Sequence, residues 1–560
     1  MSTINLEVNG VPVTVPAGTN VLDAAATAKI AIPKLCYHSD LPAWAACGIC
    51  VVKVAGSPKL IRACALEATE GMKVITHDPE LQEIRRTVIE LILSTHPNSC
   101  LTCPRNGTCE LQTLAADFGI REQRFESNVR DIPADTSTPS IVLNPEKCVG
   151  CGRCVKVCQG LQDVWALEFL DRGDGTRMAP AGDITLNESP CIKCGQCSAH
   201  CPVGAIFEKD ETQIVYNGIR DESKHKVVQI APAVRVALGE AFGMEPGSIV
   251  TGKIYAALRR LGFDTIFDTN FAADLTIMEE GSEFVERFVN GKGALPLITT
   301  CCPSWVDYME KYYSEMIPHF STAKSPQMMM GALVKTYFAD KIGKKADEIF
   351  LTSVMPCTSK KYEIVRDENM RSSGAQDIDV VITTRELARM IKQAGITFDS
   401  LEDEPADEAL GIYTGAGTIF GATGGVMEAA LRTAYHLVTG DELENVEFEA
   451  VRGLEGIKRA SVDIKGTEVR VAVAHNMKNI KIILDEVKEA LESGGELPYH
   501  FIEVMACRGG CVSGGGQPYG GDDELRKQRI AAIYRDDVDQ TIRVSHKNPA
   551  IKALYDDFLG

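Results

Sequence analysis

The chain contains, from Thr299 to Trp305, the sequence TTCCPSW, in which two adjacent cysteines precede a proline. Two further cysteine motifs follow at a distance: MPCTSK from Met355 to Lys360 and EVMACRGGC from Glu503 to Cys511. Taken alone, the first segment is also compatible with two buried cysteines at the end of a strand. Taken together, four thiolates from three loops can hold a 4Fe-4S cluster and leave one free thiol beside it.

In this order, the three segments resemble the active-site signature of FeFe-hydrogenases, and Met355, Lys360 and Met505 match that signature as well. The resemblance implies reversible oxidation of dihydrogen to protons and electrons at an H-cluster. That cofactor joins a 4Fe-4S cluster to a di-iron subsite with carbonyl, cyanide and dithiolate ligands. The resemblance assigns the following residues to the 4Fe-4S part, the last also bridging to the di-iron subsite: Cys302, Cys357, Cys507 and Cys511.

The resemblance also implies roles around the di-iron subsite. Cys301, the remaining thiol, is expected to pass protons to and from the dithiolate amine, which suits a group with an unperturbed pKa of about 8.5. Lys360 is expected to donate a charge-assisted hydrogen bond to a cyanide ligand. The residues expected to line the pocket are Pro232, Ala233, Ser325, Gln327, Met355, Phe420 and Met505.

A proton route to solvent is implied in the same way. Glu280 and Glu283 lie one helical turn apart, Arg287 follows Glu283 at i+4, and Ser321 precedes an Ala-Lys-Ser-Pro segment. In the family, this set links Cys301 to solvent; without the resemblance, the glutamates would be interpreted as a solvated helix face. Three positions depart from the residues more frequent in the family: Thr300, Ser304 and Ala233. None is a ligand, so the departures bear on pocket polarity and oxygen sensitivity.

Composition indicates a multidomain globular protein, since 560 residues that are 45% hydrophobic can bury several cores. A net charge of -19 disfavours nucleic acid as a partner. The start of the chain shows neither a secretory nor a twin-arginine pattern, so we expect a cytoplasmic protein without membrane association. In such a reducing compartment, the 20 cysteines are interpreted as metal ligands rather than disulfides.

The N-terminal region begins with alternating apolar residues on both sides of Asn9-Gly10, which predicts a β-hairpin. Pro12 should confine the second strand to a sheet edge, and Thr19 should cap a helix through Ala24 to Lys29. Four cysteines in loop-like surroundings follow: Cys36, Cys47, Cys50 and Cys64. They resemble the 2Fe-2S site of plant-type ferredoxins and, by their spacing, that of the large iron-sulfur subunit of complex I; a zinc site is the alternative.

An amphipathic helix from Leu81 to Ile92 is predicted to end near His96-Pro97. The pattern His-x3-Cys-x2-Cys-x5-Cys then follows, formed by His96, Cys100, Cys103 and Cys109. The same pattern occurs in hydrogenases and in complex I, which implies a 4Fe-4S cluster with one imidazole ligand. Because a neutral imidazole leaves the cluster less negative, its potential should be higher, as suits a relay or branch point. A merely packed or solvated histidine is the alternative.

An internal repeat follows a linker around residues 132–140. Its two Cys-x2-Cys-x2-Cys-x3-Cys runs are typical of bacterial two-cluster ferredoxins, in which the fourth cysteine of each run ligates the other cluster. We therefore expect one 4Fe-4S cluster on Cys148, Cys151, Cys154 and Cys201. The second should be held by Cys191, Cys194, Cys197 and Cys158.

From about residue 226 the sequence alternates between apolar runs and amphipathic helices, which predicts an α/β domain with the motifs on strand-end loops. The Gly-rich run from Gly415 to Gly421 lacks a nucleotide-binding pattern and is interpreted as backbone packed near the cofactor. We therefore expect α+β ferredoxin-like iron-sulfur modules followed by an α/β domain with the hydrogenase H-cluster fold. The expected domains are a β-grasp 2Fe-2S domain (1–80), a His/Cys3 4Fe-4S domain (81–140), a two-cluster ferredoxin domain (141–215) and the H-cluster domain (216–560).

These sites account for all 20 cysteines. A pure electron-transfer subunit would leave the five catalytic-loop cysteines unexplained, and assembly factors of the hydrogenase-like type lack counterparts of Cys301 and Lys360. The chain has no flavin or nicotinamide motif, so it should exchange electrons with ferredoxin or with a flavin-containing, NAD-linked partner subunit. The complex-I-like N-terminal region and residues 278–284 favour a hetero-oligomeric NAD-linked complex, including an electron-bifurcating one. A self-contained ferredoxin-dependent hydrogenase is the alternative.

Overall fold

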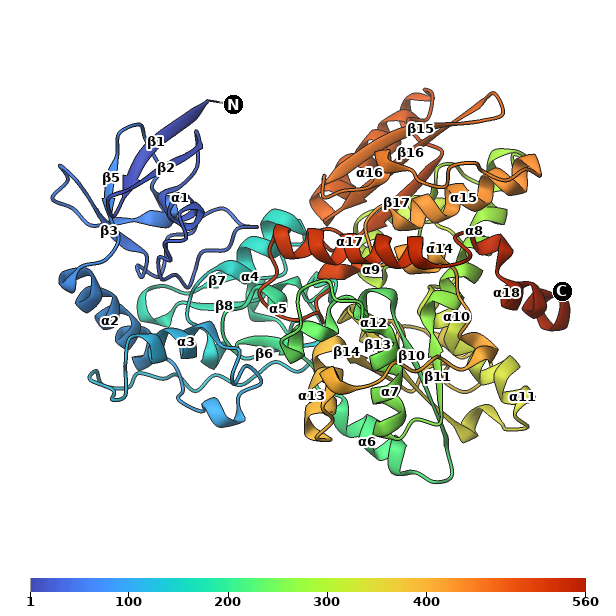
Figure 1. The fold of residues 1–560 in the computed structure, drawn as a ribbon, viewed down its shortest axis with the longest axis horizontal. Helices are drawn as coiled ribbons and strands as arrows, with labels where there is room; N and C mark the ends of the chain where they lie inside the picture. Colours follow the sequence, from blue (N-terminus) through green and yellow to red (C-terminus); the bar gives the residue numbers. More distant parts are fainter. Residues whose placement is uncertain (1) are drawn as a thin grey trace.

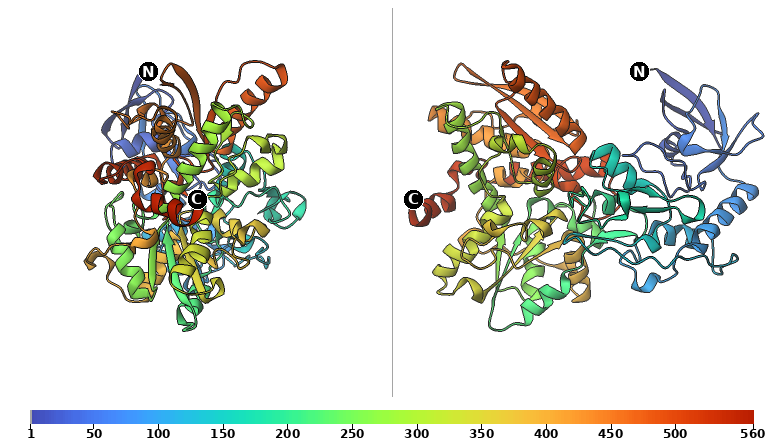
Figure 2. Two further views of the ribbon diagram at one scale, coloured as in Figure 1. Left: turned by 90° about the vertical axis from the view of Figure 1, so that its right-hand side faces the viewer. Right: turned by 180° about the vertical axis from the view of Figure 1, so that it is seen from behind.

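The computed structural model describes residues 2–560 and places the iron-sulfur modules at one end and a larger α/β domain at the other (Figure 1). The opposite views show the same arrangement, with the N-terminal domain projecting from the rest of the molecule (Figure 2). Helix α17 (Asp523–Asp539) crosses the front of the α/β domain, and its first turns lie beside the iron-sulfur modules (Figure 1). The expected fold class is confirmed, with mixed α/β sheets following the ferredoxin-like modules.

The N-terminal domain contains a five-stranded sheet in the order β2-β1-β5-β3-β4. Strands β1 (Thr3–Val8) and β2 (Val11–Pro16) form the predicted hairpin, with Val8 opposite Val11 and β2 at the sheet edge. Asn9 and Gly10 both have positive φ, 52° and 81°, as a two-residue type I′ turn requires. The remaining strands are β3 (Val51–Val54), β4 (Ile61–Arg62) and β5 (Lys73–Ile75).

The predicted cap of the first helix, α1 (Val21–Thr27), is wrong by one residue. Asn20 is the N-cap, and its side chain accepts a hydrogen bond from the Asp23 amide at 2.9 Å. The Thr19 hydroxyl instead donates to the Pro16 carbonyl at 2.7 Å, at the end of the hairpin. Both residue types are good caps, so the local strand end decides which one serves the helix.

The central modules consist of short elements around the cysteine runs. Helices α2 (Pro79–Ser94) and α3 (Glu110–Asp117) flank the segment from His96 to Cys109. Helices α4 (Arg153–Lys156) and α5 (Gln196–His200) each follow a glycine with positive φ inside a cysteine run. Two antiparallel pairs complete this part: β6 (Ile141–Leu143) with β9 (Ile206–Glu208), and β7 (Glu168–Leu170) with β8 (Arg177–Ala179).

The α/β domain is built on two four-stranded sheets. The first has the order β11-β10-β13-β14 and is parallel throughout: β10 (His225–Ile230), β11 (Thr265–Asp268), β13 (Ile349–Met355) and β14 (Val380–Thr383). The second has the order β12-β17-β16-β15, with only β15 and β16 antiparallel: β12 (Leu297–Ile298), β15 (Ile457–Ile464), β16 (Thr467–His475) and β17 (Phe501–Met505).

Helices cover both sheets (Figures 1 and 2). The central one is α8 (Thr269–Phe288), which packs against α10 (Pro326–Leu333), α14 (Gly415–Ile419) and α15 (Gly425–Thr439). The other main helices are α6 (Thr212–Arg220), α7 (Thr251–Leu261), α9 (Pro303–Tyr312), α12 (Ser359–Glu363), α13 (Thr384–Gln393), α16 (Met477–Ser493) and α18 (Pro549–Leu554). Throughout residues 2–560, no helix has the length and apolarity needed to cross a bilayer.

A buried ion network ties α15 to α17 behind the catalytic loops. The Arg432 guanidinium lies 2.7 Å from Glu428 and 2.9 Å from Asp537, and all three side chains are fully buried. Without Arg432, each carboxylate keeps one arginine, Arg452 or Arg543, but five hydrogen bonds donated by the buried guanidinium are lost.

We therefore predict that Arg432→Met lowers the free energy of unfolding of the α/β domain by about 3 kcal/mol or more. The measurement is the shift in the urea midpoint of the far-ultraviolet circular dichroism signal. Arg371→Met is the control, because its pairing with Glu368 is exposed and long, at 3.7 Å. Equal midpoints for the two variants would contradict a structural role for the network.

Candidate active site and electron-transfer centres

The three cysteine loops meet because the strands before them end at neighbouring positions. β12 precedes Cys301 and Cys302, β13 precedes Cys357, and β17 precedes Cys507 and Cys511. Parallel strands place their carboxyl ends at one edge, where α/β folds gather ligands. β12 and β17 are neighbours in one sheet, and β13 belongs to the other, so the site lies between the two sheets.

Glycines allow the third loop to pack on the second. A Cβ added to Gly514 would lie 2.2 Å from the Pro356 carbonyl oxygen, and one added to Gly510 would lie 2.6 Å from the Thr423 amide nitrogen. Gly510 also has φ +97°, a conformation that favours glycine. This close approach brings the cysteines on the two loops together.

The gathered thiols have the chemistry of a metal site. Burial, with a smaller contribution from neighbouring thiols, raises the pKa of Cys357 and of Cys511 to about 12. Burial also raises the pKa of Cys302 and, strongly, that of Cys507. Thiolates in such surroundings need a nearby positive charge, which iron would supply. These four residues therefore fit the 4Fe-4S part of an H-cluster.

Cys301 lies beside these four cysteines but has other neighbours. It is partly accessible and packs against the buried apolar cluster that contains Ala233, Phe420 and Met505. Burial, followed by the nearby charge of Glu280, raises the pKa of the Cys301 thiol well above its ordinary value. The thiol is therefore held in its protonated form, as a proton donor requires.

Lys360 is held by two oxygen acceptors at the edge of the site. Its ammonium donates to the Cys301 carbonyl at 3.0 Å and to Glu363 Oε2 at 2.8 Å. An ammonium group has three N–H donors, so one remains for a ligand in the pocket. Glu363 was not predicted from the sequence as a site residue. Its position three residues after Lys360 in a helix indicates an ion pair between them.

The remaining predicted pocket residues lie around the same site. Gln327 is fully buried, donates to Glu363 at 2.8 Å and accepts from Ser353 at 2.9 Å. Ser325 caps α10, while Met355 ends β13 next to the second loop. The others are buried at the far wall: Pro232, Ala233, Phe420 and Met505. Gly421 packs closely against Ile533 and Ala233: a Cβ at this position would lie 2.9 Å from Ile533 Cδ1 and 3.4 Å from the Ala233 amide nitrogen.

The four predicted proton-route residues also come together. Glu280 is buried, and neither of its carboxylate oxygens has a hydrogen-bond partner. Burial raises its pKa to about 7, and the nearby Ser321 hydroxyl opposes the rise. The Ser321 hydroxyl donates to Glu283 Oε2 at 3.2 Å, and Glu283 pairs with Arg287 at 2.6 Å. Glu283 lines an open surface depression, so the series runs from the Cys301 neighbourhood to solvent.

The four N-terminal cysteines form one group. Hydrogen bonds from Cys47 and Cys64 lower the pKa of Cys36, and one from Cys64 lowers the pKa of Cys50 to about 7. Such mutual contacts require the four sulfur atoms to lie together, which fits a 2Fe-2S cluster. All four thiols come from loops or a short turn around the small sheet.

The His96 segment forms a small pocket whose lining includes His96, Cys100, Cys103 and Cys109. Burial lowers the pKa of His96 to about 4, so its imidazole is neutral, as a metal ligand must be. Its Nδ1 atom is buried without a hydrogen-bond partner. An iron-sulfur cluster with one imidazole ligand fits this orphaned atom and the three thiols.

Two further cavities lie in the ferredoxin-like module. The lining of the first includes Cys148, Cys151, Cys154 and Cys201. The lining of the second includes Cys158, Cys191, Cys194 and Cys197. Each run thus contributes its fourth cysteine to the other cavity, which fits two 4Fe-4S clusters with crossed ligands.

These sites adjoin one another. Gln196, between Cys194 and Cys197, donates to the Cys507 sulfur at 3.1 Å and so joins the second ferredoxin site to the catalytic loops. The His96 site meets the first ferredoxin site, because Arg105 donates to the Cys201 carbonyl at 2.9 Å. The contact between Gln196 and Cys507 spans 311 positions and was not predicted from the sequence.

The fold and these centres define an iron-sulfur oxidoreductase with a thiol-lined catalytic pocket. A family model of the iron-only hydrogenase large subunit, C-terminal domain, matches residues 224–515, and one of the iron hydrogenase small subunit matches 523–560. Models of a 2Fe-2S cluster binding domain, an NADH-ubiquinone oxidoreductase-G iron-sulfur binding region and a 4Fe-4S dicluster domain match residues 1–79, 85–124 and 147–205.

The chain belongs to the FeFe-hydrogenase family, as predicted from the three cysteine loops. It is 46% identical over 574 residues to the NADP-reducing hydrogenase subunit HndD of Solidesulfovibrio fructosivorans, covering 100% of this chain and 96% of that one. It is 42% identical over 565 residues to iron hydrogenase 1 of Clostridium pasteurianum, covering 99% and 96%. The solved structure of the FeFe-hydrogenase HydA1 from Chlamydomonas reinhardtii is 40% identical, with a TM-score of 0.55, and covers 63% of this chain and 95% of its own. The protein is thus a hydrogenase with an H-cluster domain and an iron-sulfur relay.

We predict that Cys301→Ala retains its iron and the infrared bands of iron-bound carbonyl and cyanide. Its turnover should fall by more than the roughly hundred- to ten-thousand-fold typical of one acid-base group. The reason is that water cannot easily replace the thiol in a closed pocket. Cys301→Asp should keep part of the rate, with a pH optimum moved toward acid unless burial raises the carboxyl pKa. Full turnover in an iron-replete alanine variant would exclude Cys301 from proton transfer.

We predict a pH-dependent stability difference for Glu280→Gln. A carboxyl pKa raised from 4.5 to about 7 contributes stability below the unfolded pKa that is lost as pH rises toward 7. Wild type should therefore lose about 2 to 3 kcal/mol relative to the variant between pH 5 and pH 8. Urea unfolding at the two pH values tests this. Glu286→Gln is the control, since its lowered pKa leaves that carboxylate ionised in both states over this range.

Proposed function

We propose that this chain is the catalytic subunit of a hetero-oligomeric, NAD(P)-linked hydrogenase that reversibly converts dihydrogen into two protons and two electrons. The observation that carries the reaction is the arrangement of Cys301, with Lys360 on one side and Glu280 on the other, beside four cysteines suited to a cluster. The support for complex membership is full-length similarity to a subunit of an NADP-reducing hydrogenase. Self-contained, ferredoxin-dependent activity is the alternative.

Cys302, Cys357, Cys507 and Cys511 would hold the 4Fe-4S part of the cofactor. When bound, the H-cluster supplies the iron site at which dihydrogen is split or formed. Lys360 donates its free N–H to an anionic ligand and is kept charged and oriented by Glu363. Met355, Phe420 and Met505 exclude water from this side of the pocket.

Protons move along the series Cys301, Glu280, Ser321 and Glu283. The Cys301 sulfur holds or releases a proton, and Glu280, with its pKa of about 7, changes protonation state easily near neutral pH. Ser321 lies beside Glu280 and donates to Glu283, whose charge is balanced by the buried Arg287. Each group can both accept and return a proton, which suits a reversible reaction.

Electrons leave through one 2Fe-2S cluster and three accessory 4Fe-4S clusters, held by the four sites described above. The proposed domains follow these sites, with boundaries after residues 80, 140 and 215. The Gln196 contact supports entry from the second ferredoxin site into the catalytic cluster.

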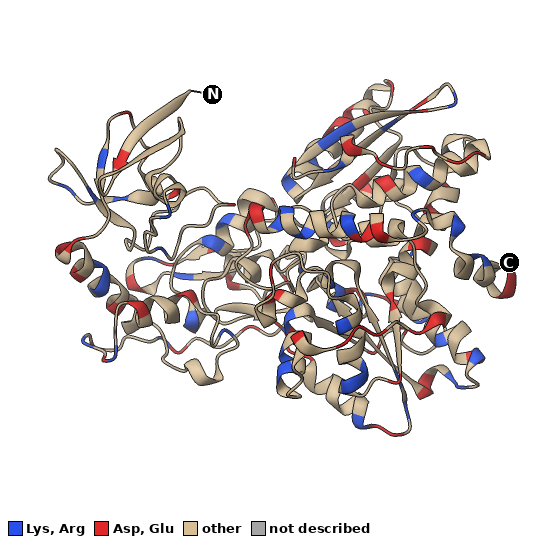
Figure 3. Cartoon of the chain, viewed as in Figure 1, with Lys and Arg blue, Asp and Glu red and all other residues tan. Residues whose placement is uncertain are grey.

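The partner is proposed to be a flavin-containing, NAD-linked subunit that docks at the N-terminal modules. Residues 1–140 carry 12 Lys and Arg against 15 Asp and Glu, so they hold only -3 of the net charge of -19. Acidic and basic residues are interspersed over these modules (Figure 3). An acidic partner would therefore meet less repulsion there than at the α/β domain.

We predict that Cys109→Ala removes the cluster at the His96 site and lowers activity with the physiological partner. Hydrogen/deuterium exchange at the catalytic centre should persist, because it needs no net electrons. Parallel measurement of iron content, exchange and partner-dependent reduction tests this. Loss of both activities together would show that the modules fold as one unit.

An infrared spectrum of the matured protein tests the proposed reaction centre. Iron-bound carbonyl and cyanide bands are expected, and a non-catalytic electron-transfer or assembly protein would lack them. Co-purification with a flavoprotein from native cells tests complex membership. Full hydrogen evolution from reduced ferredoxin by the isolated chain would favour the self-contained alternative.

A further inference from the structure

The loop of residues 36–50, which carries three of the four 2Fe-2S ligand cysteines, is anchored at two points on the first ferredoxin site. At the first point, the Trp44 ring lies on Gly152, so that a Cβ added to Gly152 would be 3.0 Å from the ring atoms. Gly152 is flanked by Cys151 and lies two residues before Cys154, so Trp44 contacts the backbone between two proposed cluster ligands. An aromatic residue of one module thus covers the ligand loop of the other.

Two further contacts fix the Trp44 ring. It stacks on Phe169, with centroids 6.0 Å apart and planes at 14°. The Lys156 ammonium lies 4.4 Å from the ring centroid on the same module. Trp44 nevertheless remains 41% exposed. A tryptophan held by three partners of another module, rather than buried in its own core, indicates a docking contact.

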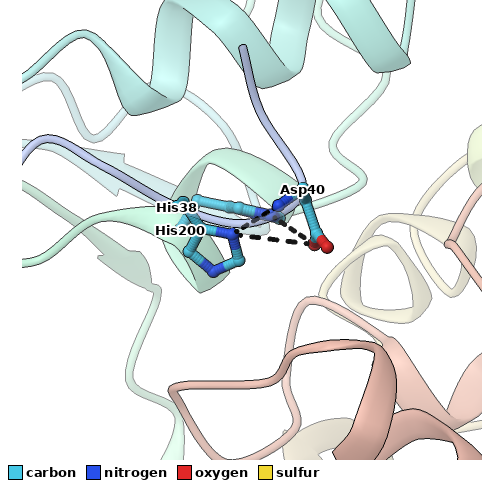
Figure 4. Close-up of side chains that lie close together, drawn as sticks. All are labelled: His38, Asp40 and His200. Carbon is cyan, nitrogen blue, oxygen red and sulfur yellow. Dashed lines mark hydrogen bonds and ion pairs between the residues drawn. The ribbon is translucent and has the colours of Figure 1, made fainter. Parts of the chain in front are cut away.

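The second anchor is Asp40, which joins three segments of the chain (Figure 4). Its buried carboxylate lies 3.2 Å from Nε2 of His200, the residue that directly precedes Cys201. Arg526 of α17 pairs with both carboxylate oxygens, one at 2.7 Å. His38 lies next to His200, with ring centroids 4.5 Å apart, and its Nδ1 is 3.8 Å from the same carboxylate oxygen (Figure 4).

This group is an ionic junction rather than a metal site. The two histidines and Asp40 have the composition of a cation site. However, the Arg526 guanidinium already neutralises Asp40 in bidentate fashion, and a divalent cation would have to displace it. A third link supports the junction: Arg153, next to Gly152, donates to the Tyr37 carbonyl at 3.0 Å, directly after Cys36.

We propose that Trp44 and Asp40 are positioning residues that seat the 2Fe-2S site directly against the Cys148, Cys151, Cys154 and Cys201 site. One electron then passes between the two clusters of this pair, from the reduced to the oxidised one. The proposal rests on the proposed electron relay. Because tunnelling rates fall steeply with distance, a small displacement of this loop slows the transfer even when both clusters are intact.

The test uses the full-length protein with all clusters in Trp44→Ala, Asp40→Asn and the double variant. Pulsed EPR measures the enhancement of 2Fe-2S spin relaxation by its neighbour, which depends on their separation. Freeze-quench EPR after mixing with dihydrogen measures the rate of 2Fe-2S reduction. Trp44→Phe, which keeps an aromatic ring on Gly152, is the conservative variant. Trp165→Ala, which removes an exposed tryptophan elsewhere on the ferredoxin-like module, is the matched control.

We expect weaker relaxation enhancement in the double variant and a rate of 2Fe-2S reduction lowered by about tenfold, as small misplacements commonly cost in rate. Trp44→Phe should recover most of the rate, and Trp165→Ala should match wild type. Unchanged coupling and rate in an iron-replete double variant would overturn the proposal. Hydrogen/deuterium exchange in wild type is measured alongside, and its absence would count against the proposed function instead.

Discussion

The structure depends on the cost of burying sulfur ligands in negatively charged form. Burial raises the pKa of the catalytic-loop thiols, so these cysteines can be thiolates together only when a cation compensates their charge. The backbone is shaped to make this compensation compact. Gly514 lets the third loop touch the second at Pro356, and Gly510 lets it touch the backbone at Thr423, where a side chain would force the segments apart. The two sheets therefore serve mainly to bring three strand ends to one place.

The same constraint explains what could be predicted from the sequence. Ligand sets that lie within one short segment, such as His96 to Cys109, are visible as spacing, because a cluster fixes the distance between its ligands. The two crossed ferredoxin cavities followed from a known repeat pattern in the same way. Contacts between distant segments left no such pattern. Gln196 with Cys507 and Asp40 with Arg526 span 311 and 486 positions, and only the fold brings them together.

Competition between two neighbouring residues explains why the cap of the first helix was predicted at Thr19 and not at Asn20. Thr19 and Asn20 are both good helix caps, and the sequence offers no rule to choose between them. The choice follows from the preceding hairpin, whose last carbonyl engages the Thr19 hydroxyl. Glu363 was overlooked for a related reason: an acid three residues from a lysine on a helix is common at surfaces. Its importance comes from burial, since its side chain is only 8% exposed and neutralises Lys360 inside the protein.

Two buried glutamates on either side of the active site, Glu363 and Glu280, differ in their hydrogen bonding. On one side, Glu363 accepts hydrogen bonds from Lys360 and Gln327, so this carboxylate is fixed and can orient an ammonium group. On the other side, Glu280 has no hydrogen-bond partner, and burial brings its pKa to about 7. Hydrogen bonds to an ionised carboxylate favour that form, whereas burial without them favours the protonated form. Burial and hydrogen bonding together therefore suit Glu280 to carry protons, while the contacts of Glu363 suit it to orient Lys360.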